Sequence, residues 1–260
     1  MRSIALTLFL VLAAPAFAIP EEPVETPIAV PSPIPVGFLV AWKPSLLSVR
    51  VDTGAGSQFG SDKLQLLRGL GRWTTTLFDE RLMARAEFEG GQFQSDTATS
   101  LGSKGADFTA RLLGGVATRV KPGFVVTASA GFITRYQWGT QAQQGAPRGG
   151  VFGVNSNIEL EYRVAPLLSV SAYLEGALAP VPYAMQPNLG SLSDATEFRA
   201  RLQFSLDVGP STAVDFGYDF TRWHATFTRS NLLDPAGSPD KALLLEDREH
   251  ALTFGIRWKP

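Results

Sequence analysis

The sequence contains no cysteine, has few charged residues and carries almost no net charge. Only 18% of its 260 residues are charged, and it has two histidines. The absence of cysteine excludes a disulfide framework, a thiolate metal site and a cysteine nucleophile. A formal net charge of −1 without a basic block creates no field that attracts nucleic acid, so no nucleic-acid partner is expected.

A continuous apolar run occurs at the N-terminus, and this run is short. Arg2 is followed by an apolar stretch from Ile4 to Ala14 and then by Ala16-Phe17-Ala18. A transmembrane helix needs about 20 apolar residues, whereas a charged start, a short apolar run and an A-x-A site are typical of a secretory signal peptide. We therefore expect residues 1–18 to be a signal peptide.

Residues 19–36 form an acidic, proline-rich segment. Prolines occur at positions 20, 23, 27, 31, 33 and 35. Proline lacks a backbone N–H and disrupts helices and sheet ladders, so this segment should be extended. At about 3.1 Å per residue it would reach roughly 50 Å, which suits a periplasmic tether.

The rest of the chain alternates between apolar and polar residues. In "VNSNIELEYRV", residues 154–164, mostly apolar side chains alternate with Asn155, Asn157, Glu159, Glu161 and Arg163. A β-strand sends successive side chains to opposite faces, so one face of this strand is apolar and the other is charged. The same pattern predicts ten strands, at residues 45–55, 63–78, 81–94, 105–120, 123–138, 154–164, 167–179, 195–209, 211–225 and 249–258. The first two are less regular, and a bulge near Gly69 or Gly71 would explain the second.

The connections between these strands are alternately short and long. Short turns are expected at Asp79-Glu80, Lys121-Pro122-Gly123, Ala165-Pro166 and Gly209-Pro210-Ser211. Long loops are expected at roughly 54–63, 95–104, 139–150, 180–194 and 228–247. Short turns at one end and long loops at the other indicate an antiparallel meander of hairpins.

Two kinds of barrel produce this alternation. In a soluble barrel the apolar side chains fill the interior, whereas in a membrane barrel they face lipid and the polar face lines the lumen. Long strands, an even strand count and short turns on one side favour the membrane barrel, because hydrocarbon tolerates a sheet only when it is closed. We therefore predict an all-β fold, an antiparallel up-and-down transmembrane β-barrel of about ten strands over residues 37–260, in the outer membrane of a Gram-negative bacterium.

The C-terminus and the strand ends carry aromatic residues that suit this environment. Phe254, Ile256 and Trp258 alternate in a segment that resembles the C-terminal assembly signal of bacterial outer-membrane proteins, although Lys259 and Pro260 follow. The resemblance implies that outer-membrane lipid and the barrel assembly machinery are partners. An aromatic girdle is expected at the membrane boundaries, formed by Tyr136, Trp138, Phe152, Tyr162 and Trp258.

The polar face predicts a lumen filled with ion pairs. The expected lumen-lining residues are Arg85, Glu87, Arg111, Arg135, Glu159, Glu161, Arg163, Glu175, Arg199, Arg201, Asp215, Asp219 and Arg257, and Glu89, Asp107, Glu197, Asp207 and Glu249 share their parity. In a barrel of about ten strands these charges should pair across a narrow space, giving either a polar plug or a narrow selective pore.

Catalysis, metal binding and cofactor binding have little support in the sequence. Some small outer-membrane barrels are hydrolases or acyltransferases with a histidine near the outer rim, and His224 and His250 are the candidates here. Asp215 and Asp219 have the opposite parity to His224, and no Asp-x-His pair exists, so the ten-stranded outer-membrane protease family is a poor match despite the strand number. No metal-ligand cluster or phosphate-binding loop is present, and no cofactor is expected.

The tether suggests a partner on the periplasmic side. Glu25, Thr26, Ile28 and Val30 lie in "ETPIAV", which resembles the short segment by which outer-membrane receptors engage an energised periplasmic partner. Such a segment would bind by adding a strand to its partner's sheet, although Pro27 removes one donor; the alternative is a plain spacer. We predict a non-catalytic anchor or subunit of an envelope complex, such as a motility or secretion machine; a narrow solute-selective pore and a rim hydrolase are the alternatives.

Overall fold

The computed structural model describes residues 36–52, 57–77, 82–94, 104–139, 149–183, 191–228 and 243–259. Within these ranges the side chains of residues 49, 51–52, 57–63, 77, 93–94, 104, 138–139 and 243 are not described. The signal peptide predicted for residues 1–18 and the tether predicted for 19–36 lie outside these ranges, apart from Val36. In the described ranges, no helix is long and apolar enough to span a membrane.

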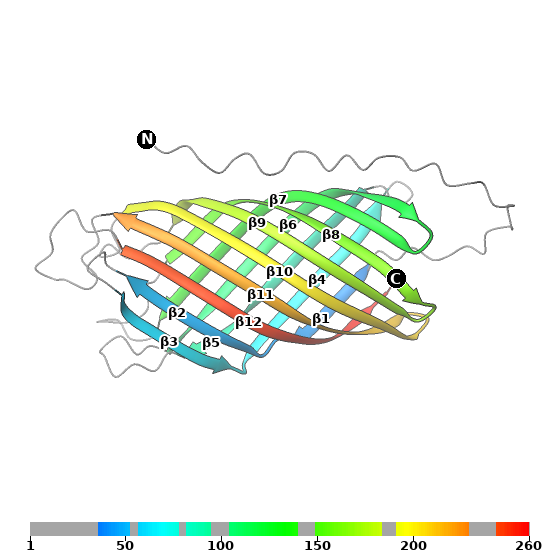
Figure 1. Cartoon of the computed structure of the whole chain (residues 1–260), viewed down its shortest axis with the longest axis horizontal. Coiled ribbons are helices and arrows are strands. Elements are labelled where there is room, and N and C mark those ends of the chain that lie inside the picture. Colours follow the sequence, from blue (N-terminus) through cyan, green and yellow to red (C-terminus); the bar gives the residue numbers. More distant parts are fainter. Residues whose placement is uncertain are drawn as a thin grey trace, which may run out of the picture. The chain divides into compact units, whose positions relative to one another are not determined.

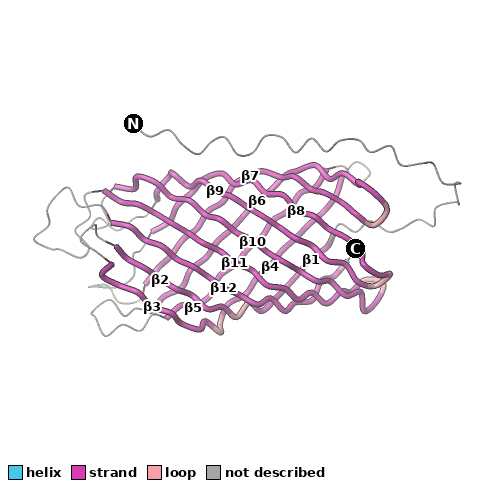
Figure 2. Tube along the Cα trace, viewed as in Figure 1, coloured by secondary structure: helices cyan, strands magenta, loops and turns pink. Residues whose placement is uncertain are grey.

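The described chain folds into antiparallel strands of one sheet, as Figures 1 and 2 show. The strands are β1 (Gly37–Trp42), β2 (Ser45–Asp52), β3 (Ser57–Gln65), β4 (Arg68–Leu77), β5 (Leu82–Gln94), β6 (Lys104–Lys121), β7 (Phe124–Gly139), β8 (Gly149–Ala165), β9 (Leu168–Tyr183), β10 (Ser191–Gly209), β11 (Thr212–Thr228) and β12 (Leu243–Trp258). β1 and β2 follow one another along β12 and together cross the barrel wall once, and β3 and β4 together do the same beside them. We call each such full crossing of the wall a stave. With the eight single strands β5 to β12, the barrel has ten staves.

The barrel is closed by β1, which pairs with β4 on one side and with β12 on the other. Phe38 lies opposite Trp258 and Val40 lies opposite Ile256, while the same strand pairs with Arg68–Leu77 through its other edge. Every strand from β4 to β12 pairs with its neighbour in the sequence. The predicted closed antiparallel barrel is therefore confirmed.

The first two staves are interrupted, which explains their irregular sequence pattern. Pro44 cannot donate a backbone hydrogen bond, and the chain between β1 and β2 is held by Lys43 N to Arg68 O, at 3.0 Å, and by Leu252 N to Pro44 O, at 3.0 Å. The second stave breaks at Leu66-Leu67. The bulge predicted near Gly69 or Gly71 was wrong in position, because the register through both glycines is continuous.

Several strands run further toward the long-loop end than the sequence pattern indicated. β3 begins at Ser57 rather than 63, β9 continues to Tyr183, β10 begins at Ser191 and β12 begins at Leu243. These extensions lack strict alternation, because main-chain pairing does not require it where neither face needs to be apolar. The short turns at Lys121–Phe124, Ala165–Leu168 and Gly209–Thr212 are as predicted, and the first contains Gly123 at φ 73°. The turn at Asp79-Glu80 lies outside the described residues.

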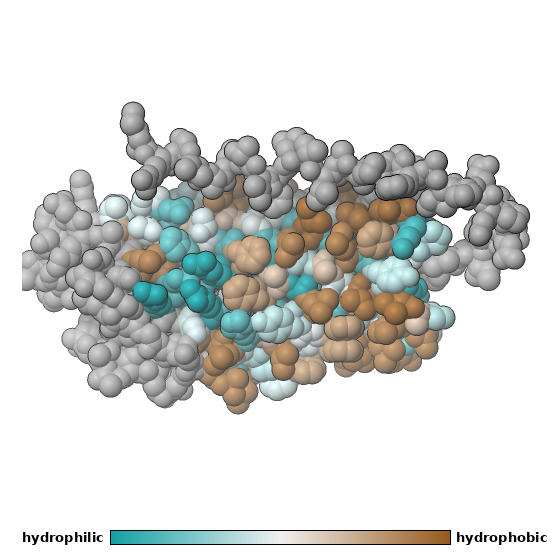
Figure 3. Space-filling model, viewed as in Figure 1, coloured by the Kyte–Doolittle hydropathy of each residue, from teal (hydrophilic) through white to brown (hydrophobic). Residues whose placement is uncertain are grey.

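The two faces of the sheet have opposite polarity. The exterior carries exposed large apolar side chains on every stave, and the hydrophobic surface in Figure 3 covers much of the short-turn end of the view. Examples are Phe88, Leu112, Phe132, Leu160, Leu174, Phe198, Phe216 and Phe254. The interior is lined mainly by buried charged and polar side chains. Such a surface is stable when hydrocarbon surrounds the barrel.

Closure can be tested directly because the chain has no cysteine. Val40→Cys with Ile256→Cys places two thiols opposite one another across the β1–β12 seam. Opposed antiparallel residues have Cα atoms about 4.5–5.5 Å apart, which suits a disulfide. We expect rapid intramolecular cross-linking on oxidation, measured as a reducible mobility shift on a denaturing gel.

The matched control is Val40→Cys with Leu252→Cys. Residue 252 is four positions from the partner of Val40 along β12, or about 13 Å, and should not cross-link intramolecularly. Equal cross-linking of the two pairs would contradict the seam register.

Candidate functional site: the charged lumen

The lumen holds every residue predicted to line it. Arg85, Glu87, Arg111, Glu159, Glu161, Glu175, Arg199, Arg201, Asp215, Asp219 and Arg257 are buried, and Arg135 and Arg163 are partly buried. All of them lie on the inner parity of their strands. The alternation that makes the exterior apolar therefore delivers these charges to one enclosed space.

Arg199 on β10 is at the centre of the lumen network. Its Nη2 donates to Glu89 Oε2 at 2.8 Å, its Nε donates to Asp219 Oδ1 at 2.9 Å, and it also forms an ion pair with Glu87. β5, which carries both glutamates, lies on the opposite side of the ring from β10. The side chains of opposite walls therefore meet in the middle of the barrel.

Further cross-lumen contacts extend this network. Arg111 Nε donates to Glu175 Oε1 at 2.9 Å and the same side chain forms an ion pair with Glu197. Arg85 Nη2 lies 2.5 Å from Glu159 Oε2. These contacts connect β6 to β9 and β10, and β5 to β8, so the network links walls that are not neighbours in the sheet.

Charged and polar side chains also pair toward both ends of the lumen. Toward the long-loop end, Arg135 on β7 lies 2.6 Å from Asp247 on β12, and its guanidinium lies 4.8 Å from the centre of the Trp223 ring. Toward the short-turn end, Gln203 Nε2 donates to Asp215 Oδ2 at 3.1 Å, and Arg257 also pairs with Asp215. The ion pairs therefore occur at several levels of the barrel.

The structure adds three basic residues that the sequence prediction did not include. Lys43 is fully buried and lies 2.8 Å from Glu89, Arg72 lies 2.8 Å from Glu87, and Arg68 lies 2.7 Å from Asp107. All three belong to the interrupted staves. Lys43 lies before the first strand that the sequence predicts. At Leu66-Leu67 the inward positions change from odd to even residue numbers, so the sequence pattern did not assign Arg68 and Arg72 to the inner face.

The decisive observation is a closed ring with an apolar outer face and an ion-paired inner face. In water this arrangement would expose a large apolar surface while it buried charges, whereas in a membrane it satisfies both faces. The chain is a membrane-spanning β-barrel, the fold predicted for an outer-membrane protein.

Comparisons with solved structures give distant likenesses in fold. No protein-family model and no curated protein matches the chain. Among solved structures, the outer membrane protease OmpT from Escherichia coli is 10% identical with a TM-score of 0.44, covering 86% of this chain and 97% of that one. The translocator domain of autotransporter NalP from Neisseria meningitidis is 11% identical with a TM-score of 0.41, covering 83% and 88%. Outer membrane protein OprG from Pseudomonas aeruginosa is 8% identical with a TM-score of 0.37, covering 86% and 97%.

The residues predicted to form an aromatic girdle lie on the exterior wherever their side chains are described. Phe152 stacks on Phe132 with ring centres 5.7 Å apart, and Trp258 stacks on Phe38 at 6.3 Å. Tyr136 stacks on Tyr183, and Tyr162 meets Phe124 edge-on. The side chain of Trp138 lies outside the described residues. Their role at the membrane boundary remains a prediction.

The two histidines lie on the exterior of the barrel. The Tyr218 hydroxyl hydrogen-bonds to His250 Nδ1 at 2.6 Å, and His250 packs against Phe220 with ring centres 5.0 Å apart. His224 has the same outer parity, whereas Asp215 and Asp219 are buried in the lumen. The barrel wall therefore separates these imidazoles from those two carboxylates.

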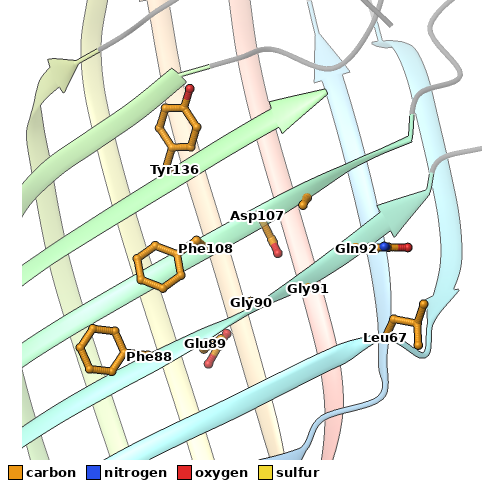
Figure 4. A pocket seen from close by; sticks show the side chains of 10 residues that line it. Leu67, Phe88, Glu89, Gly90, Gly91, Gln92, Asp107, Phe108 and Tyr136 are labelled. Carbon is orange, nitrogen blue, oxygen red and sulfur yellow. The ribbon is translucent and has the colours of Figure 1, made fainter. Parts of the chain in front are cut away.

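A mainly apolar groove of about 920 Å³ lies over β5 and β6, between Tyr136 on β7 and Leu67 at the bend between β3 and β4. Figure 4 shows Phe88 on β5, Phe108 on β6 and Tyr136 on β7 along it, with Leu67 at the bend. Gly90 and Gly91 form part of its wall, and a Cβ at Gly91 would lie 2.1 Å from Leu67 O. Glycine therefore allows the close approach of β5 to the bend. The polar residues that line the groove are Glu89, Gln92, Asp107 and Tyr136.

Removing the central arginine should destabilise the barrel. Arg199→Leu leaves Asp219, Glu87 and Glu89 without this partner inside the lumen, and breaking a buried ion pair costs about 3–5 kcal/mol. We expect a loss of that order in the free energy of unfolding, measured by urea titration in lipid vesicles with heat-modifiable gel migration as the readout.

Arg119→Leu is the control, because Arg119 is exposed near the short-turn end of β6. Exposed substitutions usually change stability by about 0.5 kcal/mol or less. Equal effects of the two substitutions would show that the lumen network does not stabilise the fold.

Proposed function

We propose that this protein is a non-catalytic outer-membrane anchor, a subunit of an envelope complex. The barrel supplies a rigid body fixed in the membrane, and the tether and the outer loops supply contacts to other proteins. Motility and secretion machines are complexes that need such anchors.

The observation that carries this proposal is the bridging of the lumen by Arg199. Its contacts reach Asp219 on the neighbouring strand and Glu87 and Glu89 on the opposite wall. Lys43 and Arg111 join the same carboxylates from two other directions. A barrel of about this strand number has an interior that side chains nearly fill, so the ion pairs act as a plug. Solute passage would require breaking several buried ion pairs at once.

A narrow pore is the alternative, and electrical recording separates it from the anchor. In planar bilayers we expect the mature protein to show no single-channel steps. Arg199→Ala combined with Arg111→Ala removes the central bridges and should produce a small leak, whereas Arg119→Ala should not.

Charge-reversal variants show what is expected if the native barrel is a pore. If the native barrel is a pore, it will show discrete steps whose ion selectivity changes with Arg135→Glu or Glu159→Arg. Such steps would replace the anchor proposal with a selective channel.

The tether is the second element of the proposal. Glu25, Thr26, Ile28 and Val30 lie outside the described residues, and their partner-binding role rests on the sequence resemblance alone. Strand addition by this segment would let a periplasmic protein grip the barrel without altering the lumen. The plain spacer is the alternative, and the two differ in whether the side-chain sequence matters.

A tether exchange tests this role. Residues 19–36 are replaced by a Gly/Ser linker of equal length, so that reach is retained while the sequence is lost. We expect loss of a periplasmic partner in cross-linking pulldowns, with heat-modifiable migration unchanged. Recovery of the same partners at the same yield would reduce the segment to a spacer.

A further inference from the structure

A charged cluster lies on the outer face of β11 and β12, whereas most of the barrel exterior is apolar. Arg222 Nε and Arg248 Nε donate to the same Glu246 oxygen, at 2.8 and 2.7 Å. The arginine side chains are 50% and 51% exposed, whereas that of Glu246 is 8% exposed. We call Arg222 and Arg248 the exterior arginine pair.

The pairing of the strands makes this arrangement unusual. Arg222 lies directly opposite Arg248, and like charges in that position repel. A single carboxylate, Glu246, contacts both guanidinium groups, so the trio carries a net positive charge. Because that contact uses Nε of each arginine, the Nη groups of both remain suited to a further anion.

Among the neighbouring side chains that the structure describes, none reverses this positive charge; Asp52 on β2 and Asp62 on β3 share the outer parity, and their side chains lie outside the described residues. On β2, the exposed Arg50 lies opposite Glu246, and on β10 the apolar Phe198 lies opposite Arg222. An exterior acid, Asp194, occurs further toward the long-loop end, opposite Thr226. In Figure 3 hydrophilic surface gathers toward the long-loop end of this face.

The height of the arginine pair coincides with the edge of the membrane. From Thr212 at the short turn to Arg222 are ten residues, which at about 3.3 Å each and a tilt of about 40° rise roughly 25 Å. That distance equals the usual apolar band of such barrels, about 25 Å. Below the pair, the exterior residues of β11 and β12 include Phe216, Phe220, Leu252 and Phe254.

We propose that the exterior arginine pair binds the phosphate group of an outer-leaflet lipid, whose acyl chains lie along the apolar surface below. Phosphate oxygens match the forked geometry of two guanidinium groups, and a bound anion relieves the repulsion between them. A lipid fits better than free phosphate, because the cationic cluster continues directly into an apolar surface that the chains cover.

The proposal is tested with the full mature chain by native mass spectrometry of lipid adducts. The probes are a lipid A that carries two phosphates, the same lipid after enzymatic dephosphorylation, and inorganic phosphate. We expect the phosphorylated lipid to bind at least tenfold more tightly than the dephosphorylated lipid, and inorganic phosphate at millimolar concentration to displace little of it. Equal binding of the two lipids by the unmodified protein would overturn the proposal, whatever the variants do, and efficient displacement by inorganic phosphate would show a simple anion site instead.

Variants locate the site. Arg222→Gln with Arg248→Gln should lower the affinity for the phosphorylated lipid roughly ten- to a hundredfold. The double replacement by lysine keeps the charge but loses the fork, so it should retain intermediate affinity. Arg119→Gln at the opposite end of the barrel is the matched control and should bind as the native chain does. Heat-modifiable migration verifies that each variant is folded, and native affinity in the folded glutamine variant would refute the assignment.

Discussion

Closure of the sheet by β1 is the constraint on which the rest of this structure depends. Within hydrocarbon no water is available for unpaired backbone groups, so a strand is stable there only when both of its edges are hydrogen-bonded. β1 provides this by pairing with β4 and β12 at once. Once the ring is closed, each strand has a lipid face and a lumen face, and the period of two fixes which side chains go to each.

The lumen follows from closure and strand number together. A ring of ten staves is too narrow to hydrate many charges freely, and it brings side chains from opposite walls within contact distance, as Arg199 and Glu89 show at 2.8 Å. Isolated charges in such a space would be costly, and paired ones are tolerated. The dense pairing accounts for a stable, occupied interior and is the basis for proposing an anchor rather than a channel.

On the exterior, apolar side chains give way to charged ones at the level of the exterior arginine pair. Within the apolar band the outward-facing positions hold residues such as Phe216 and Leu252. Beyond the band, the outward-facing positions of the same strands hold Arg222, Glu246 and Arg248. The change occurs at the same level on neighbouring strands, which fits the border between acyl chains and headgroups. Charged groups on the lipid face cost little near that border, so the position tolerates a function that the band does not.

The sequence alone determined the fold class, the turn ends and the inner face of the regular strands, because one alternating pattern over β5 to β12 specifies all three. It misjudged the interrupted staves, because Lys43 lies before the first predicted strand and because Leu66-Leu67 reset the parity, and so it missed Lys43, Arg68 and Arg72. Which charges meet was decided by the tertiary structure. Arg199 reaches Glu87 and Arg135 reaches Asp247 only because ring closure and strand stagger bring distant staves opposite one another. The alternation within one strand does not show which residue lies across the lumen, and it does not show that Arg222 lies opposite Arg248. Both pairings are set by how the strands align in the closed barrel.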